Sequence, residues 1–350
     1  MISAASTKVV ITAPSAGAVS LSSRRAVSHV SRTRRCKLST THKRVVRCSV
    51  SPEESSNPGE SRLLRTIATN GEVVVTLAKT TSVVNDSIQR HQTSPTVGGA
   101  LGRGLTAVML MASFRGEGEQ VQVTFKGSGP IGNMTVMSTH LGEVRGMVSN
   151  PQAQVPLKPD GTLDVGSAIG PGTLQVVRSL PMLEPYTGIV PITNGEVAED
   201  LAVYLRDSEQ QNTALGVGVS IEPDGTCGAA GGFFVQSLPF TGDDTVEMLE
   251  RNIGKLPPIT EMISNGVPLE DITSMILEGI GCSPGAEVKT PVYGPCGAVH
   301  LRPRMLKAVA SIPPNEILET IDEVGSMEVT CEFCKETIQF SKEDLTQLLV

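Results

Sequence analysis

Apolar and polar residues alternate along much of the chain between residues 61 and 240, which is the pattern of half-buried β-strands. Apolar residues spaced three to four apart interrupt this pattern and predict helices at 80–92, 106–112 and 195–207. Many strands with few helices indicate an α+β domain with a mixed sheet. The predicted strands cover residues 72–78, 121–125, 134–136, 163–165, 174–177, 188–191, 216–221 and 229–238, with one more around Val148.

The pattern changes between residues 241 and 290. Apolar positions predict two short helices here, one around Leu249 and one around Ile276. Pro257 and Pro258 separate them, because proline interrupts the hydrogen bonds of a helix. Short helices that each carry little apolar surface are marginally stable, so we interpret this segment as a metastable helical linker.

The last part of the chain, residues 291–350, has the pattern of a small separate domain. Apolar spacing predicts helices around Leu306 and Ile317, and alternation then predicts a two-stranded hairpin with Cys331 and Cys334 at its turn. A domain of about 60 residues with so small a core usually requires a metal or a disulfide to fold. We therefore expect a small C-terminal domain of the zinc-binding type.

The first 50 residues differ from the rest in composition. They contain ten Lys/Arg and fifteen Ser/Thr but no Asp or Glu, and the first acidic residue is Glu53. This is the composition of an organelle transit peptide, and Cys48 lies in a sequence that resembles a chloroplast processing site. We expect a chloroplast protein with a transit peptide at 1–50 and a disordered lead-in at 51–60. A mitochondrial location, or a basic tail that binds nucleic acid or membrane, is the alternative.

The charge of the remaining chain argues against nucleic-acid binding. Without the first 50 residues it has 19 basic and 36 acidic residues, a net charge of −17. Such a chain has no excess of cations to release counterions from phosphate. No stretch approaches the roughly 20 apolar residues of a membrane span, so we expect no membrane partner either.

Four of the seven cysteines lie in the last quarter of the chain, which is typical of a local metal or redox site. Cys331 and Cys334 are three residues apart in a hairpin, which favours zinc binding over thiol–disulfide exchange, because the exchange motif requires a helix start. Cys296 is the third candidate ligand. The fourth is Cys282 or His300, and we favour Cys282 because a thiolate can be oxidised in a pair.

A glycine-rich motif at Gly127, Gly129 and Gly132 matches the dinucleotide-binding fingerprint in its spacing. That mechanism requires a helix after the last glycine, whereas here Pro130 lies inside the motif and a predicted strand follows. The motif is therefore better explained as a hairpin turn. For His91, we expect a hydrogen-bonded structural role.

Several segments, in order along about 280 residues, resemble the thirty-three-kilodalton heat-shock protein family of redox-regulated molecular chaperones. Independent motifs in one order make the resemblance specific. The matching segments are His-Gln-Thr-Ser-Pro-Thr at 91–96, Ala-Leu-Gly-Arg at 100–103, Lys-Gly-Ser-Gly-Pro-Ile-Gly at 126–132, Gly-Glu-Val-Arg-Gly at 142–146, Glu-Asp-Leu at 199–201, Ser-Glu-Gln at 208–210, Gly-Gly-Phe at 231–233 with Gln236, and Cys-Glu-Phe-Cys at 331–334.

The resemblance implies a holdase rather than an enzyme. Its fold would be an N-terminal α+β domain, a metastable linker and a C-terminal domain in which four thiolates bind zinc. Oxidation would convert thiolates to disulfides, with Cys331 and Cys334 as the expected redox disulfide, and would release the metal. The linker would then unfold and bind unfolding client proteins, and the active form would often be a homodimer.

The chain departs from the family in its first cysteine pair. The family has a Cys-x-Cys pair before the first C-terminal helix, whereas this chain has Tyr-Gly-Pro-Cys-Gly-Ala at 293–298. Cys296, Cys331 and Cys334 carry over, but Cys282 is not a family position. An odd number of thiols would leave one sulfur to form a sulfenic acid or a mixed disulfide. A zinc-independent or heat-activated holdase with a structural C-terminal domain is the alternative.

Overall fold

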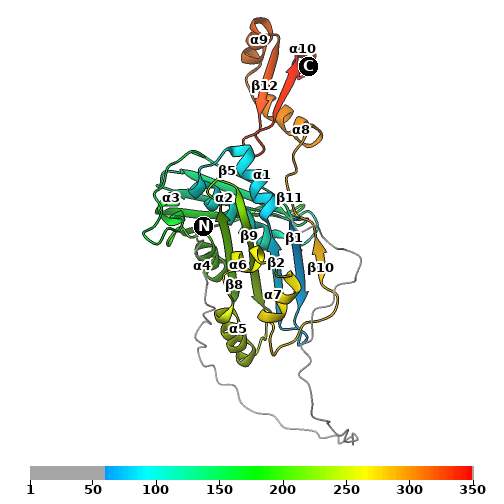
Figure 1. Ribbon diagram of the computed structural model, residues 1–350. Helices are drawn as coiled ribbons and strands as arrows, with labels where there is room; N and C mark the ends of the chain where they lie inside the picture. The colour runs from blue at the N-terminus through cyan, green and yellow to red at the C-terminus, as the bar shows by residue number, and fades with distance from the viewer. Residues whose placement is uncertain (1–59, 349–350) are drawn as a thin grey trace, which may run out of the picture.

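The computed structural model describes residues 60–348, and in it two packed β-sheets form a body from which a small C-terminal module projects (Figure 1). The predicted transit peptide lies outside these residues, as does the predicted lead-in up to residue 59. The α+β fold class is confirmed. No helix in the described part of the chain is long and apolar enough to cross a membrane.

The first sheet has five strands, and all its neighbours are antiparallel. The edge strand β10 comes from the end of the segment predicted as a linker, so the last residues of that segment belong to the sheet. In spatial order the strands are β10 (Glu287–Lys289), β1 (Arg62–Ile67), β2 (Val73–Lys79), β9 (Cys227–Ser237) and β8 (Thr213–Ile221).

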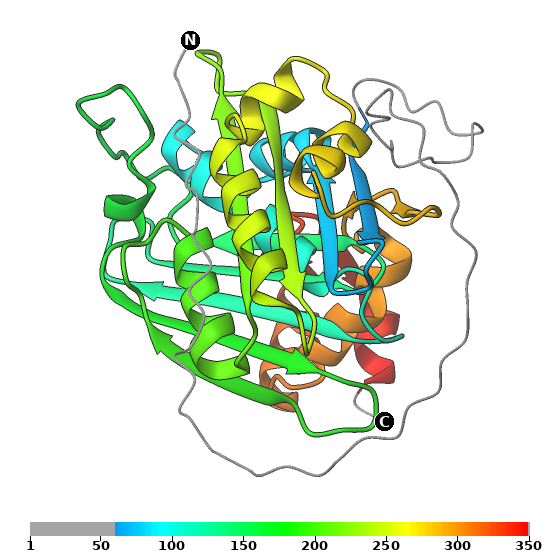
Figure 2. The ribbon, with the colours of Figure 1, turned by 90° about the horizontal axis from the view of Figure 1, so that it is seen from below.

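The second sheet has six strands and is mixed, because β11 pairs with β5 in parallel while the other pairs are antiparallel. Figure 2 shows its strands crossing behind those of the first sheet. In spatial order they are β11 (Val292–Tyr293), β5 (Glu143–Val148), β4 (Asn133–Thr139), β3 (Gln120–Gly127), β6 (Gly172–Ser179) and β7 (Tyr186–Pro191).

Helix α2 (Pro95–Ala112) lies between the sheets and is the centre of the core. Every residue from Thr96 to Ala112 is buried, because the helix contacts strands of both sheets. Its glycines permit this close approach: a Cβ at Gly102 would lie 2.8 Å from Val84 and 3.1 Å from Val219. The helix begins eleven residues before the predicted segment at 106–112, in a stretch whose glycines weaken the local helical signal.

The other predicted elements of the body are found with one exception. The helices predicted at 80–92 and 195–207 are α1 (Thr81–His91) and α4 (Ala198–Glu209). The strand predicted at 163–165 is wrong, because this stretch leads into the short helix α3 (Val165–Ile169). A run of three alternating residues is too short to distinguish a strand from the start of a helix.

The segment after the body forms three helices rather than the two predicted: α5 (Asp243–Lys255), α6 (Ile259–Ser264) and α7 (Leu269–Ile276). The extra helix α6 begins directly after Pro258, since proline is tolerated at a helix start. Figure 2 shows these yellow helices lying over the first sheet. Each is short, but together they cover a continuous apolar cluster that includes Leu249, Ile253 and Ile272.

The C-terminal module contains the two predicted helices and the predicted hairpin, followed by a last short helix. It has its own apolar cluster, which includes Leu301, Ile317 and Phe340 and is separate from the two clusters of the body. Its elements are α8 (Ala298–Val309), α9 (Pro314–Glu323), β12 (Ser326–Thr330), β13 (Thr337–Ser341) and α10 (Lys342–Gln347).

Candidate cysteine site

The turn between β12 and β13 holds Cys331 and Cys334 with both side chains buried in the module. The Cys331 N–H donates to the Glu336 carbonyl at 2.9 Å, and the Lys335 N–H donates to the Cys331 carbonyl at 2.7 Å. Lys335 takes a positive φ of 56°, which closes the turn. The backbone of the hairpin therefore directs both sulfurs into the small core.

Cys296 completes a group of three cysteines in this core, and the structure joins its sulfur to Cys334. The Cα atoms of this pair are 6.2 Å apart, and Cys331 is a buried thiol. This differs from the expected disulfide between Cys331 and Cys334. The Gly297 N–H donates to a Glu336 carboxylate oxygen at 2.8 Å, which holds the segment before α8 beside the hairpin turn.

The structure places Cys282, the cysteine predicted as the fourth ligand, in the body and outside the apolar cluster of the module. Cys282 pairs with Ala68 beside the end of β1, and its sulfur lies 3.5 Å from the Thr66 hydroxyl in the cluster under the linker helices. The pairing of β10 with β1 fixes this stretch to the first sheet, away from the module. The alternative ligand His300 lies in α8 with its side chain exposed.

The donor set of the module fits a metal only in part. Cys296, Cys331 and Cys334 supply three sulfurs, whereas a closed structural zinc site requires four ligands. In the disulfide form two of these sulfurs are bonded to each other, so they are not thiolate ligands. Accordingly, residues 60–348 contain no group of three or more His, Cys, Asp or Glu side chains arranged to hold a metal ion. Only the reduced form presents the three sulfurs together as ligands.

Phe333, between the two cysteines of the turn, connects the module to the body. Its carbonyl accepts a hydrogen bond from His91 Nε2 at 3.0 Å and lies 2.6 Å from the Tyr293 hydroxyl. That hydroxyl also lies 2.9 Å from the Gly146 carbonyl of β5. The Phe333 ring stacks with the Arg145 guanidinium at 5.6 Å. The residue that links the two cysteines is therefore held by the body through both backbone and side chain.

His91 donates from Nε2 to the Phe333 carbonyl, because a carbonyl can only accept, and the Tyr293 hydroxyl lies 3.0 Å from the same nitrogen. Burial lowers the pKa of His91, and the charge of nearby Lys335 lowers it further. Its other ring nitrogen, Nδ1, is buried and has no hydrogen-bond partner among the described residues. A second proton on this ring would therefore be an unpaired buried charge.

Arg90, the neighbour of His91 on α1, makes a second connection. Its guanidinium donates to the Glu336 carboxylate at 3.0 Å and to the Cys334 carbonyl at 3.2 Å, and it stacks on the Tyr293 ring at 5.4 Å. We refer to Arg90, His91, Arg145 and Tyr293, together with Phe333 and Glu336, as the docking site.

An electrostatic contact relates the third thiol to the docking site. Burial and the neighbouring Arg304 lower the pKa of Arg145, whereas negative charge on the Cys331 sulfur raises it. Arg145 therefore lies close to the sulfur of Cys331, the cysteine that is outside the disulfide. It also donates to the Pro295 carbonyl at 3.4 Å, one residue before Cys296.

Sequence reasoning did not find most of the docking site. His91 was expected to be hydrogen-bonded and structural, and this is confirmed, but nothing in the sequence related it to the hairpin turn more than 240 residues later. Arg145 lies within one of the segments that resemble the chaperone family. Arg90 and Glu336 carried no local signal, because an isolated charged residue on a predicted helix or turn is usually exposed.

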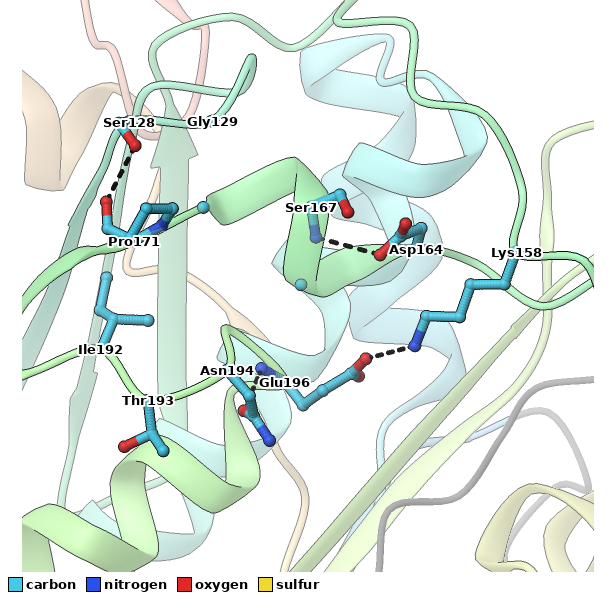
Figure 3. A pocket seen from close by; sticks show the side chains of 12 residues that line it. Ser128, Gly129, Lys158, Asp164, Ser167, Pro171, Ile192, Thr193, Asn194 and Glu196 are labelled. Carbon is cyan, nitrogen blue, oxygen red and sulfur yellow. Dashed lines mark hydrogen bonds and ion pairs between the residues drawn. The ribbon is translucent and has the colours of Figure 1, made fainter.

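A separate polar pocket of about 690 Å³ lies beside the glycine-rich motif (Figure 3). The motif forms the turn between β3 and β4, so no helix follows it, and the hairpin interpretation is confirmed. A Cβ at Gly127 would lie 1.9 Å from the Ile169 carbonyl oxygen, and one at Gly129 would lie 2.2 Å from that of Ala168. These glycines permit close contact with α3, and they do not surround a pyrophosphate.

The pocket wall contains an ion-paired group. Lys158 Nζ lies 2.6 Å from the Glu196 carboxylate, which also pairs with the buried Arg103. Figure 3 shows Lys158 and Glu196 directed toward each other. Asp164 also lines the pocket, so the two carboxylates balance the charges of Lys158 and Arg103. The pocket therefore does not present a net charge that would select a phosphate or a carboxylate.

Comparisons with known proteins agree with this architecture. The family model described as Hsp33 protein matches residues 61–341. The chain is 39% identical over 287 residues to a 33 kDa chaperonin of Geobacillus sp. (strain WCH70), covering 82% of this chain and 96% of that protein. It is 38% identical over 289 residues to the 33 kDa chaperonin of Bacillus subtilis (strain 168), covering 82% and 97%.

A solved structure is also similar. The crystal structure of the 33 kDa chaperonin, a heat shock protein 33 homolog, from Thermotoga maritima superposes with a TM-score of 0.74 at 33% sequence identity. The match covers 83% of this chain and 98% of that one. The similarity thus includes the body, the linker helices and the cysteine module rather than the body alone.

Proposed function

This chain belongs to the Hsp33 family, whose members are redox-regulated holdase chaperones, and we propose that it binds unfolding proteins after its C-terminal cysteines are oxidised. The observation that supports this most directly is the position of Phe333. The cysteine turn is itself the part of the module that docks on the body, so a chemical change at Cys331 or Cys334 acts on the contact with α1 and β5.

The oxidation that we propose uses peroxide and two thiols. One thiolate attacks the peroxide O–O bond and becomes a sulfenic acid, with release of hydroxide. The second thiolate attacks the sulfenic sulfur, forms the S–S bond and displaces the hydroxyl group; with the two thiol protons, the products are one disulfide and two water molecules. Cys296 and Cys334 are the pair whose sulfurs the structure joins. Cys331 then remains as a thiol that can form a sulfenic acid or a mixed disulfide.

In the reduced form we propose that Cys296, Cys331 and Cys334 bind one zinc ion. Bound zinc would keep the three sulfurs as thiolates and tie the hairpin turn to the segment before α8. The chain contributes the orientation of the ligands: the turn holds two sulfurs inward, and Glu336 holds the segment of the third. With three thiolates the fourth position stays accessible to water, so we expect weaker binding than in a four-thiolate site.

A zinc-independent or heat-activated holdase is the second candidate. It is favoured by the missing fourth ligand and by the disulfide between Cys296 and Cys334, which can stabilise the module without a metal. In this case the module would be structural, and heat would release the linker helices.

Light scattering from a thermally aggregating protein, such as malate dehydrogenase, tests both candidates. We expect the peroxide-treated protein to suppress the scattering, and the reduced protein to suppress it less. Cys331→Ser should change how strongly peroxide treatment increases the suppression of light scattering. Cys227→Ser is the matched control, because burial in the body raises the pKa of Cys227 to about 12 and makes this thiol unreactive.

Two results would separate the candidates. Equal suppression by the reduced and oxidised forms would reject redox control and support the heat-activated holdase. If neither form suppresses aggregation at any temperature below its own unfolding, both candidates are rejected.

We also propose that the protein acts in the chloroplast, with the mitochondrion as the alternative. The support is the composition of the first 50 residues, which contain ten basic residues and no acidic ones. The client proteins would then be those of that organelle, and an active homodimer is part of the same proposal.

A further inference from the structure

The four edge strands of the two sheets differ in how they are protected. Strand β10 is three residues long and carries Glu287 and Lys289, and β11 has only two residues. Strand β8 is almost wholly buried and lies against α4 and α6. Strand β7, Tyr186–Pro191, has six residues, none of them charged, and four of the six are exposed. Natural sheets usually protect such an edge with charges, bulges or a covering helix, because its free N–H and C=O groups pair readily with other chains.

Exposed apolar side chains line this same edge. Ile189 is 62% exposed and Tyr186 is 50% exposed. The hairpin that joins β6 to β7 adds Met182, which is fully exposed, and Leu183, which is 65% exposed. Figure 2 shows the green strands of this hairpin along the outer side of the second sheet. Among the described residues, no other edge strand combines this length with uncharged, exposed apolar side chains.

The inner side of β7 holds its backbone in place. Gly188 allows the strand to lie against the buried Tyr204 of α4, where a Cβ would come within 2.6 Å of the ring. Val190 is buried in the main core, and six residue pairs connect the strand to β6. The edge is therefore already extended before any partner binds, which lowers the entropy cost of pairing with it.

We propose that the edge of β7, with the hairpin at residues 180–185, is a binding site for extended apolar segments of unfolding proteins. The occupant follows from the chemistry: free backbone groups of a strand require another extended backbone, and the exposed Met182, Leu183 and Ile189 select an apolar one. Glu184 is the one charged residue between positions 180 and 191. The Met and Leu side chains of the hairpin can adapt to different sequences. The inference rests on the proposed holdase function and names one place on the body where clients bind.

A binding measurement with a permanently unfolded chain tests this site. The probe is fluorescently labelled, reduced and carboxymethylated α-lactalbumin, and the protein is the peroxide-treated full chain. We expect Ile189→Lys and Tyr186→Lys each to weaken binding by about tenfold. Each substitution replaces an apolar side chain that the bound probe would cover with a charge at the edge. Leu318→Lys, at a 49% exposed position on α9, is the matched control and should bind as the unsubstituted chain does.

Hydrogen exchange gives a second readout that needs no substitution. Backbone amides of residues 186–190 should exchange more slowly when the probe is bound, and those of β10 should not change. Unaltered exchange at β7, or equal binding by Ile189→Lys and Leu318→Lys, would overturn the site while the holdase function stands. A chain that binds no probe in any redox state would overturn the holdase function itself. If Ile189→Lys instead converts a dimer into a monomer in size-exclusion chromatography, with probe binding intact, the edge binds a second copy and the client proposal is wrong.

Discussion

At the scale of single residues, the cysteine site depends on one position that does not carry a cysteine. Gly294 lies two residues before Cys296, where the first member of the family's Cys-x-Cys pair would be. It is next to buried Tyr293, whose hydroxyl reaches the Phe333 carbonyl. A single glycine therefore separates an open three-thiolate set from a closed four-thiolate set in the same scaffold.

Replacing Gly294 with cysteine should increase the zinc affinity by roughly 100-fold. A structural zinc site of four ligands has a binding free energy of about 10–16 kcal/mol, so one ligand contributes about 3 kcal/mol. A Cβ at this position would meet only the Cys296 nitrogen, at 3.1 Å, which requires a shift of a few tenths of an ångström. Competition with a chromophoric chelator measures the affinity of the reduced protein. Gly242→Cys is the control, since a Cβ there meets no atom within 4 Å, its φ of −70° accepts a side chain, and the position lies outside the module. An unchanged affinity in Gly294→Cys would contradict the assignment of the three ligands.

Protonation of His91 should weaken docking of the module. Burial lowers its folded pKa below the reference value of 6.5, so the unfolded state binds more protons between the two pKa values. The contribution of His91 to the free energy of unfolding is therefore fully present above about pH 6.5 and decreases as the pH drops below that value. Thermal unfolding between pH 8 and pH 5 measures the effect. His91→Gln retains an N–H donor for Phe333 but does not titrate, so it should show a flatter pH dependence; the same dependence in both proteins would disprove the role of His91.

At the scale of elements, two contacts hold the module and the linker helices against the body. One joins α1 and β5 of the body to the hairpin β12–β13 through the docking site. The other places α5, α6 and α7 on the first sheet over a shared apolar cluster. The first contact is polar and half-buried, whereas the second is apolar, so they should respond differently to substitution.

Arg90→Ala should weaken docking by about 1–2 kcal/mol, because it removes hydrogen bonds to Glu336 and to the Cys334 carbonyl in a partly buried contact. The module should then respond to lower peroxide concentrations, as measured by the onset of aggregation suppression. Arg302→Ala is the matched control: Arg302 pairs with Asp344 inside the module, and its side chain is 44% exposed. An identical peroxide threshold in the two variants would argue against the docking site as the connection.

Ile272→Ala should destabilise the packed linker by about 2–4 kcal/mol, since this side chain of α7 is fully buried against the first sheet. We expect the reduced variant to suppress client aggregation without peroxide. Met275→Ala, on the same helix but 43% exposed, should cost less than about 1 kcal/mol and remain inactive when reduced. Constitutive activity in neither variant would show that release of these helices is not what exposes the client-binding surface.

At the scale of the whole molecule, the chain combines a large stable body with a small module whose core is limited. The body contains one cluster around α2 and a second one under the linker helices, while the module has a cluster of nine buried residues, two of which are Cys331 and Cys334. Because the cysteines are part of this small core, their chemistry affects the folding of the whole module.

The mature protein should begin between residues 48 and 60, because the basic, acid-free segment ends there. Amino-terminal sequencing of the protein isolated from its native organelle checks this, with chloroplast and mitochondrial fractions compared by immunoblot. A native protein that retains Met1, or that is recovered from neither fraction, would contradict the targeting proposal.

The sequence alone determined the features that depend on neighbours along the chain. Alternation located β2 to β9 but not β1, β10 or β11. Three-to-four spacing located α1, α4 and the end of α2, and the spacing of Cys331 and Cys334 located the hairpin turn. Segment order was enough to indicate the family. These succeed because side-chain direction repeats with a fixed period in strands and helices, so burial leaves a local pattern.

Only the tertiary structure decided which distant residues meet. The pairing of β10 with β1 removed Cys282 from the cysteine site, and the crossing of the segment before α8 over the hairpin joined Cys296 to Cys334. The same packing brought Arg90 to Glu336 across 246 positions. Such partners are selected by strand order and by the position of a whole module on a sheet, and neither leaves a periodic signal at the residues concerned.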